Sequence, residues 1–120
     1  MSSRPRKWRF RLRHIIEAIS KIRDYTQGMT LEQFCVNYMV QDAVIRNFEV
    51  IGEAARYVPP EVEESHPEVA WGRMRAMRNI LAHEYDNVDL AVVWDAIQHD
   101  LPPLVPLLQA VLDADDLPEG

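Results

Sequence analysis

The stretch LEQFCVNYMVQDAVIRNFEVIGEAA, residues 31–55, places apolar side chains at the three- and four-residue intervals of an α-helix. Thr30 and Gln33 match a capping box, in which each side chain bonds the other residue's backbone amide. No proline interrupts this stripe before Pro59, so we predict one long helix, with Gly52 a candidate position for a kink. The apolar stripe consists of Leu31, Phe34, Cys35, Tyr38, Met39, Ile45, Phe48, Ile51 and Ala55.

An apolar pattern of the same period lies on the N-terminal side of this helix. It predicts a helix from about Leu12 to Tyr25, with Gly28 in the left-handed conformation that often follows a helix. The stripe of this helix is formed by Leu12, Ile15, Ile16, Ile19 and Ile22.

The C-terminal half of the chain predicts further helices. Residues 59–67 form a Pro/Glu-rich connection. Near its end, Ser65 is the expected cap of a third helix, with Glu68 in its first turn. Asn87 or Asp89 is the expected cap of a fourth. Its continuation must kink or restart at Pro102, Pro103 and Pro106, and a last short helix ends near Asp113. The predicted fold is all-α, an up-down bundle of four to five helices that forms a dimer.

Charge divides the chain into three parts. The expected boundaries are a basic N-terminal arm at 1–9, a helical bundle at 10–113 and an acidic tail at 114–120. Residues 1–23 hold eight of the thirteen basic residues, although the net charge is −6. Basic and apolar residues alternate over 7–13, which suggests extended backbone. This segment could bind nucleic acid or be a solvated helix start, and Trp8 and Phe10 could stack on RNA bases or anchor the arm to the bundle.

Composition restricts the setting of the protein. The apolar runs are too short to span a bilayer, and the basic N-terminus lacks the apolar core of a signal peptide. Cys35 is the only cysteine, so no intrachain disulfide can form, and its neighbours suggest a small buried residue. We therefore expect a cytoplasmic protein that does not bind membranes.

The segment RNILAHEY, residues 78–85, gathers the chemically versatile side chains. Arginine can hold phosphate oxygens with a planar fork of donors, and histidine can carry a proton near neutral pH. On a regular helix Arg78 and His83 point about 140° apart, so one phosphate can contact both only at a helix end or across two subunits. Such a pair suffices for metal-free RNA cleavage by the 2′-hydroxyl. Alternatively, His83 binds free carbonyls at a helix end and Arg78 pairs with an acid such as Glu84.

Other residues could contribute to this site or form another one. Glu49 and Glu53 lie one turn apart and could line a cleft near Arg78, pair with it, or be solvated. Glu63 and His66, or His14 and Glu17, have a spacing found in metal sites of helical bundles, but those sites need several inward carboxylates. We expect neither a metal nor a cofactor, and we expect His99 to interact with a helix end.

The pattern of residues resembles the HEPN superfamily, and within it the HepT-like toxins. Arg78 and His83 match its RxxxxH motif, and His83 and Tyr85 match HxY. Further similarity lies in the block Arg46–Ala54, Trp71, Met77-Arg78-Asn79 and Leu101–Leu104. The resemblance covers about 10–112 and leaves the N-terminal arm outside.

This resemblance implies an all-helical ribonuclease toxin of a type VII-like toxin–antitoxin system, with both RxxxxH motifs of a homodimer facing one cleft. Arg78 and His83 would be catalytic, with Asn79 in support and Arg46, Glu49 and Glu53 as candidate cleft residues. The implied partners are an RNA substrate and a minimal nucleotidyltransferase antitoxin, which would silence the toxin by adding AMP to Tyr85.

Two other readings of the sequence remain. The chain could be a non-catalytic helical adaptor that docks a nucleotidyltransferase and supplies only Tyr85 as acceptor. Alternatively, the basic residues of 4–23 could form a helix that binds membranes or nucleic acid without catalysis.

Overall fold

The computed structural model describes residues 7–83 and 89–114, except for the side chains of 7 and 80–83. The described residues form helices, with no strand among them, which confirms the predicted all-α class. The elements are α1 (Lys7–Thr26), α2 (Leu31–Val36), α3 (Tyr38–Ala55), α4 (Pro60–Ser65), α5 (Trp71–His83), α6 (Leu90–Asp95), a π-helical turn (Ala96–Asp100) and α7 (Leu101–Ala114).

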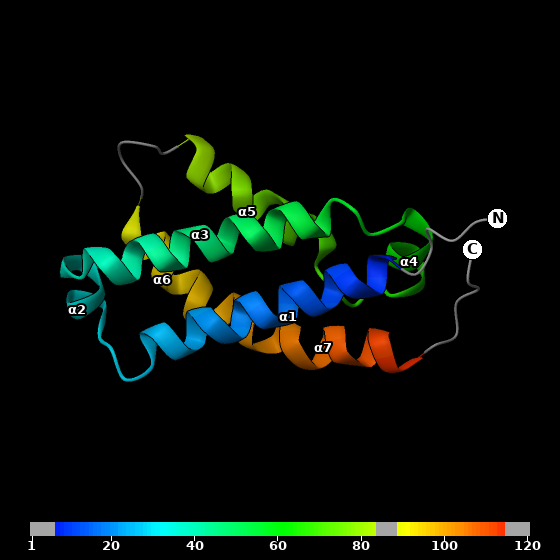
Figure 1. Ribbon diagram of the computed structural model, residues 1–120, viewed down its shortest axis with the longest axis horizontal. Coiled ribbons are helices and arrows are strands. Elements are labelled where there is room, and N and C mark those ends of the chain that lie inside the picture. Colours follow the sequence, from blue (N-terminus) through cyan, green and yellow to red (C-terminus); the bar gives the residue numbers. More distant parts are fainter. Residues whose placement is uncertain (1–6, 84–88, 115–120) are drawn as a thin grey trace.

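The long helices α1, α3 and α7 run side by side along the molecule, and α5 packs on α3 (Figure 1). The closest associations are α1 with α3 and α3 with α5, so α3 is the central element. Full burial of one large aliphatic side chain contributes about 1.5–3 kcal/mol. The fully buried large side chains come from several helices: Leu12, Ile15, Ile19, Ile22, Phe34, Val44, Ile51, Met74, Leu101, Leu108 and Val111.

Helix α1 begins at Lys7, so the expected extended backbone over 7–13 is wrong. Trp8, Leu12 and Ile15 are buried at helical spacing, and burial of this face favours the helix. The exposed fraction of Trp8 is only 5%, so it anchors the helix, whereas 55% of Phe10 is exposed. The helix ends close to the predicted position, and Gly28 follows it with φ of +77°, as predicted.

Asn37 divides the predicted long helix into α2 and α3. The capping box of Thr30 and Gln33 at the start of α2 is confirmed. Asn37 has extended dihedral angles, and its Oδ1 accepts a hydrogen bond from the Val40 amide at 3.0 Å. The Gln41 side chain donates to the Phe34 carbonyl at 2.9 Å, which satisfies a group at the end of α2. The break therefore lies at Asn37, and α3 passes Gly52 as a continuous α-helix.

The connection between α3 and α5 contains the short helix α4. Ser65 is the last residue of α4 and α5 begins at Trp71, so Ser65 does not cap the third long helix. The Trp71 indole donates to the carbonyl of His66 at 2.9 Å, and Nδ1 of that buried histidine lies 3.3 Å from the Glu68 carboxylate. These contacts fix the position of the first turn of α5.

The C-terminal helices follow one another without a break in helical structure. Asp89 caps α6, and its side chain accepts hydrogen bonds from two backbone amides. Asp89 was one of the two predicted caps of this helix. Pro102 and Pro103, at the start of α7, lack backbone N–H groups. They follow a π-helical turn, in which the helix is wider than an α-helix. Pro106 lies inside α7, which ends at Ala114, one residue beyond the predicted end. Within the described ranges, no helix is long and apolar enough to cross a membrane.

Candidate active site

The backbones of α3 and α5 approach each other closely where Gly52 faces Arg78. A Cβ atom at Gly52 would lie 2.7 Å from the Arg78 Cβ and 2.9 Å from its backbone nitrogen. Real Cβ atoms do not approach this closely, so glycine is required for space rather than for a kink. This contact sets the position from which the Arg78 side chain projects from α5.

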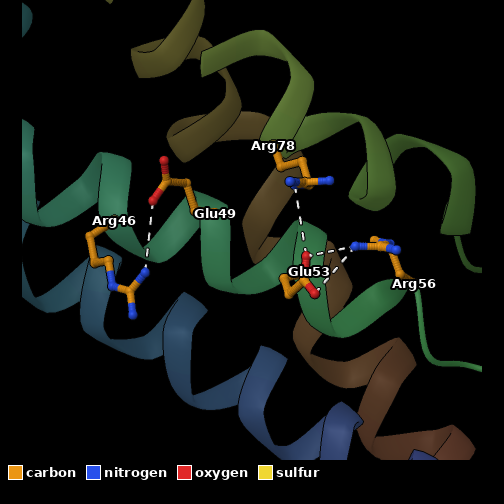
Figure 2. A network of polar contacts seen from close by, with 5 residues as sticks. All are labelled: Arg46, Glu49, Glu53, Arg56 and Arg78. Atoms are coloured by element: carbon orange, nitrogen blue, oxygen red, sulfur yellow. Dashed lines mark hydrogen bonds and ion pairs between the residues drawn. The ribbon is translucent and has the colours of Figure 1, made fainter. Parts of the chain in front are cut away.

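Polar side chains surround this crossing (Figure 2). Arg78 Nε lies 3.8 Å from Glu53 Oε1, and the same carboxylate accepts hydrogen bonds from Arg56 at 3.1 and 3.3 Å. One turn away on α3, Arg46 Nη1 lies 3.8 Å from Glu49 Oε1. The side chain of Arg78 remains 47% exposed, so its guanidinium can still bind a ligand from solvent.

These side chains line a groove of about 390 Å³ between α1, α3 and α5. It brings the predicted residues Arg46, Glu49 and Glu53 together with Arg78. Two further residues, Arg11 and His14 of α1, were not predicted as part of it. They lie three residues apart and therefore on one face of a helix, but only the packing of α1 on α3 shows which face. The lining is completed by Val50 and Ala54.

The remaining predicted site residues lie in or just after the last turn of α5. Asn79 is exposed, directly after Arg78. His83 is the last residue of α5, about 7.5 Å along the axis from Arg78 and some 500° around it. The His83 side chain and the whole of Glu84 and Tyr85 lie outside the described residues. The catalytic and acceptor roles of His83 and Tyr85 therefore stay predictions.

Three of the other candidate residues, Glu63, His66 and His99, have protein partners. Glu63 forms an ion pair with Arg75, and His66 faces Glu68. His99 lies in the last turn of the π-helical segment, with Nδ1 2.9 Å from Asp95 Oδ1. In the part of the chain that the structure describes, no three His, Cys, Asp or Glu residues are grouped to hold a metal ion.

Comparison with known proteins identifies the family. A model described as "Ribonuclease HepT-like" matches residues 15–111, from α1 to α7. The chain belongs to the ribonuclease HepT-like family. This membership confirms the resemblance inferred from the RxxxxH and HxY motifs. The family match includes Arg78, His83 and the α3 wall of the groove, whereas Arg11 and His14 precede it.

Several relatives carry names that refer to ribonucleases. "Probable ribonuclease HepT" of Thermococcus cleftensis is 40% identical over 93 residues, covering 78% of this chain and 84% of that protein. A "Putative RNase" of Caldanaerobacter subterraneus is 31% identical over 101 residues, covering 84% and 90%. "Gamma-glutamylcyclotransferase and putative RNase" of Methanocaldococcus jannaschii is also 40% identical over 93 residues, and the chain spans 42% of its length. No solved structure matches the chain.

Proposed function

We propose that this HepT-like chain is an endoribonuclease that acts as the toxin of a type VII-like toxin–antitoxin system in the cytoplasm. The observation that carries the proposal is the placement of Arg78. The α3–α5 contact holds it beside an open groove, with nearly half of its side chain accessible. An arginine fork at such a position can bind the phosphate of an RNA strand.

Arg78 has a partner that a phosphate can replace. Its contact with Glu53 is 3.8 Å long, and both side chains are more than 40% exposed. Exposed ion pairs contribute only about 0–1 kcal/mol, so exchanging this carboxylate for a bidentate phosphate costs little. In the reaction, Arg78 stabilises the negative charge that builds on the phosphate oxygens.

His83 supplies the proton transfer in this proposal. The RNA 2′-oxygen attacks the adjacent phosphorus, the bond to the 5′-oxygen breaks, and a cyclic phosphate remains. His83 accepts the proton of the 2′-hydroxyl or donates one to the leaving oxygen, a contribution of about 10²–10⁴-fold in rate. Asn79, next to Arg78 on the exposed side of α5, supports the orientation of the histidine or phosphate. The chemistry needs no metal ion.

We propose that the complete site is shared by two copies of the chain. Arg78 and His83 are about 140° apart on α5, so one copy does not present both to a single phosphate on a regular helix. A twofold dimer can bring the α5 ends of both copies to one cleft and supply the missing group in trans. Two histidines in that cleft could also divide the roles of base and acid.

The proposed regulation is addition of AMP to Tyr85 by a minimal nucleotidyltransferase antitoxin. Tyr85 is two residues beyond His83 in the sequence. A phosphate attached there competes with RNA for the arginine, and the nucleotide fills the cleft.

The experiment is RNA cleavage by the purified chain in the presence of EDTA. We expect the His83→Ala variant to lose cleavage and growth inhibition and to remain folded by circular dichroism. His99→Ala is the control, because it removes an exposed histidine outside the groove. Equal cleavage by His83→Ala and the unmodified chain would refute the catalytic assignment. AMP addition to Tyr85 in a chain without ribonuclease activity would favour the adaptor.

A further inference from the structure

The first turns of α1 form one wall of the Arg78 groove. Arg11 and His14 lie on this wall, and Arg46 lies on the α3 wall. Arg11 and His14 precede residue 15, where the family match begins. The wall therefore lies just before the matched part of the fold, on the same helix, α1.

Two contacts fasten this segment to the bundle. Trp8 is buried in the core, and the Arg9 guanidinium lies 4.7 Å from the centre of its ring. Arg9 Nη1 also donates to the carbonyl of Leu112 in α7 at 2.8 Å. Because Arg11 and His14 belong to a helix that is packed on the bundle, their backbone is held in place before a ligand arrives.

Aromatic rings lie beside Arg11 and His14 on this wall. Phe10 is 55% exposed, and its ring centre lies 4.2 Å from that of His14. The Arg11 guanidinium lies 4.2 Å from the ring centre of Tyr57, which is 51% exposed. Cations beside exposed aromatic rings are typical of surfaces that bind single-stranded nucleic acid, because cations contact phosphates while rings stack on bases.

The acids in the groove do not cancel its affinity for phosphate. Glu49 is paired with Arg46, and Glu53 is shared between Arg78 and Arg56. The ion pairs of Arg46 and Arg78 are long and exposed, so a phosphate can displace them, whereas Arg11 contacts an aromatic ring rather than an acid in its described contacts.

We propose that this groove binds the part of a single-stranded RNA next to the phosphodiester held by Arg78. Arg11 and His14 contact a flanking phosphate, and Phe10 stacks on a flanking base. The idea rests on the proposed ribonuclease function and adds to it the path of the substrate. It also assigns a role to the basic start of the chain, as a fixed wall rather than a free arm.

The test is binding of a short fluorescein-labelled oligouridylate, measured by fluorescence anisotropy in the full-length His83→Ala background, which prevents cleavage. We expect Arg11→Gln to weaken binding about tenfold, as for the loss of a charge-assisted hydrogen bond. The matched control is Arg13→Gln, which removes the same charge from an exposed position on α1 outside the groove lining. Equal losses in both variants would show only a general effect of charge and overturn the proposal, as would no loss in either.

Two further variants keep the test decisive if Arg11→Gln does not fold. Arg46→Gln, on the opposite wall, is expected to weaken binding similarly and to reduce the slope of log K against log salt by about 0.7. Phe10→Leu, which keeps an apolar side chain, is expected to weaken binding by at least about fivefold through lost stacking. Unchanged affinity in all folded groove variants would refute the RNA path.

The proposed catalysis and the proposed path can fail separately. Suppose that the unmodified chain cleaves RNA and that Arg11→Gln binds and cleaves RNA equally well. The groove assignment is then wrong and the catalytic assignment stands. If the unmodified chain does not cleave RNA but Arg11→Gln selectively loses binding, the groove binds RNA without catalysis.

Discussion

Gly52 of α3 leaves no room for a side chain against Arg78 of α5, because an added Cβ would lie 2.7 Å from the Arg78 Cβ. We expect Gly52→Ala to destabilise the fold and to displace Arg78. Overpacking costs about 1–3 kcal/mol, which outweighs the gain of roughly 1 kcal/mol when alanine replaces glycine within a helix. Denaturant unfolding measures the loss of stability, and RNA cleavage measures the displacement.

The control for this substitution is Gly72→Ala in α5. The nearest atom to a Cβ there is Arg75 Nη2 at 3.7 Å, an ordinary contact. We expect this variant to be as stable as the unmodified chain or slightly more stable. If Gly52→Ala is also neutral and fully active, the close approach does not position Arg78.

Asn37 separates α2 from α3 by capping the second helix. We expect Asn37→Ala to lower the free energy of unfolding by about 0.5–2 kcal/mol, because the Val40 amide loses its acceptor. Asn37→Asp keeps an acceptor at the same position and should retain most of the stability. Chemical denaturation of both variants measures the difference, and equal losses in both would contradict the cap.

The features that the sequence predicted well depend on neighbours along the chain. The capping box of Thr30 and Gln33, the left-handed Gly28 and the Asp89 cap each involve residues within a few positions. The alternation over 7–13 was misleading because a helix also brings residues four apart to one face, and packing of Trp8 and Leu12 selects that structure.

The features that the sequence did not predict depend on packing between helices. Gly52 was predicted as a candidate position for a kink, but its close contact is with Arg78 on another element. Asn37 fell inside the predicted long helix, because nothing local distinguishes a cap from a polar interior position. The place of Arg11 and His14 in the Arg78 groove depends on the packing of α1 against α3. The RxxxxH motif was visible because its arginine and histidine are only five positions apart in the sequence.

Glu53 pairs with the guanidinium of Arg78, the group that we propose binds the phosphate of RNA. We expect Glu53→Gln to bind single-stranded RNA several-fold more tightly, because a carboxylate that competes with the phosphate is removed. Stability should change by less than about 1 kcal/mol, since the pair is exposed. Glu61→Gln is the control, with the same charge change on exposed α4 outside the groove. Equal tightening in both variants would indicate net charge alone.

A site shared between copies predicts complementation by mixed dimers. Arg78→Ala and His83→Ala should each be inactive, but a mixed dimer has one site with arginine from one copy and histidine from the other. After subunit exchange we expect roughly a quarter of wild-type cleavage, because about half of the dimers are mixed and each has one complete site. No recovery, with mixed dimers verified by mass spectrometry, would place both groups in one copy.

Tyr85 provides the final prediction, since its hydroxyl is the proposed acceptor of AMP. Co-expression with a minimal nucleotidyltransferase should add the mass of an adenylyl group to the unmodified chain and abolish its RNA cleavage. Tyr85→Phe should gain no mass and should stay active in the same cells, because it lacks the hydroxyl but keeps the ring. Tyr57→Phe is the control, since Tyr57 is an exposed tyrosine and its substitution should leave the modification intact. Silencing of Tyr85→Phe to the same extent would mean that the partner inhibits by binding, because no AMP would then be attached to the chain.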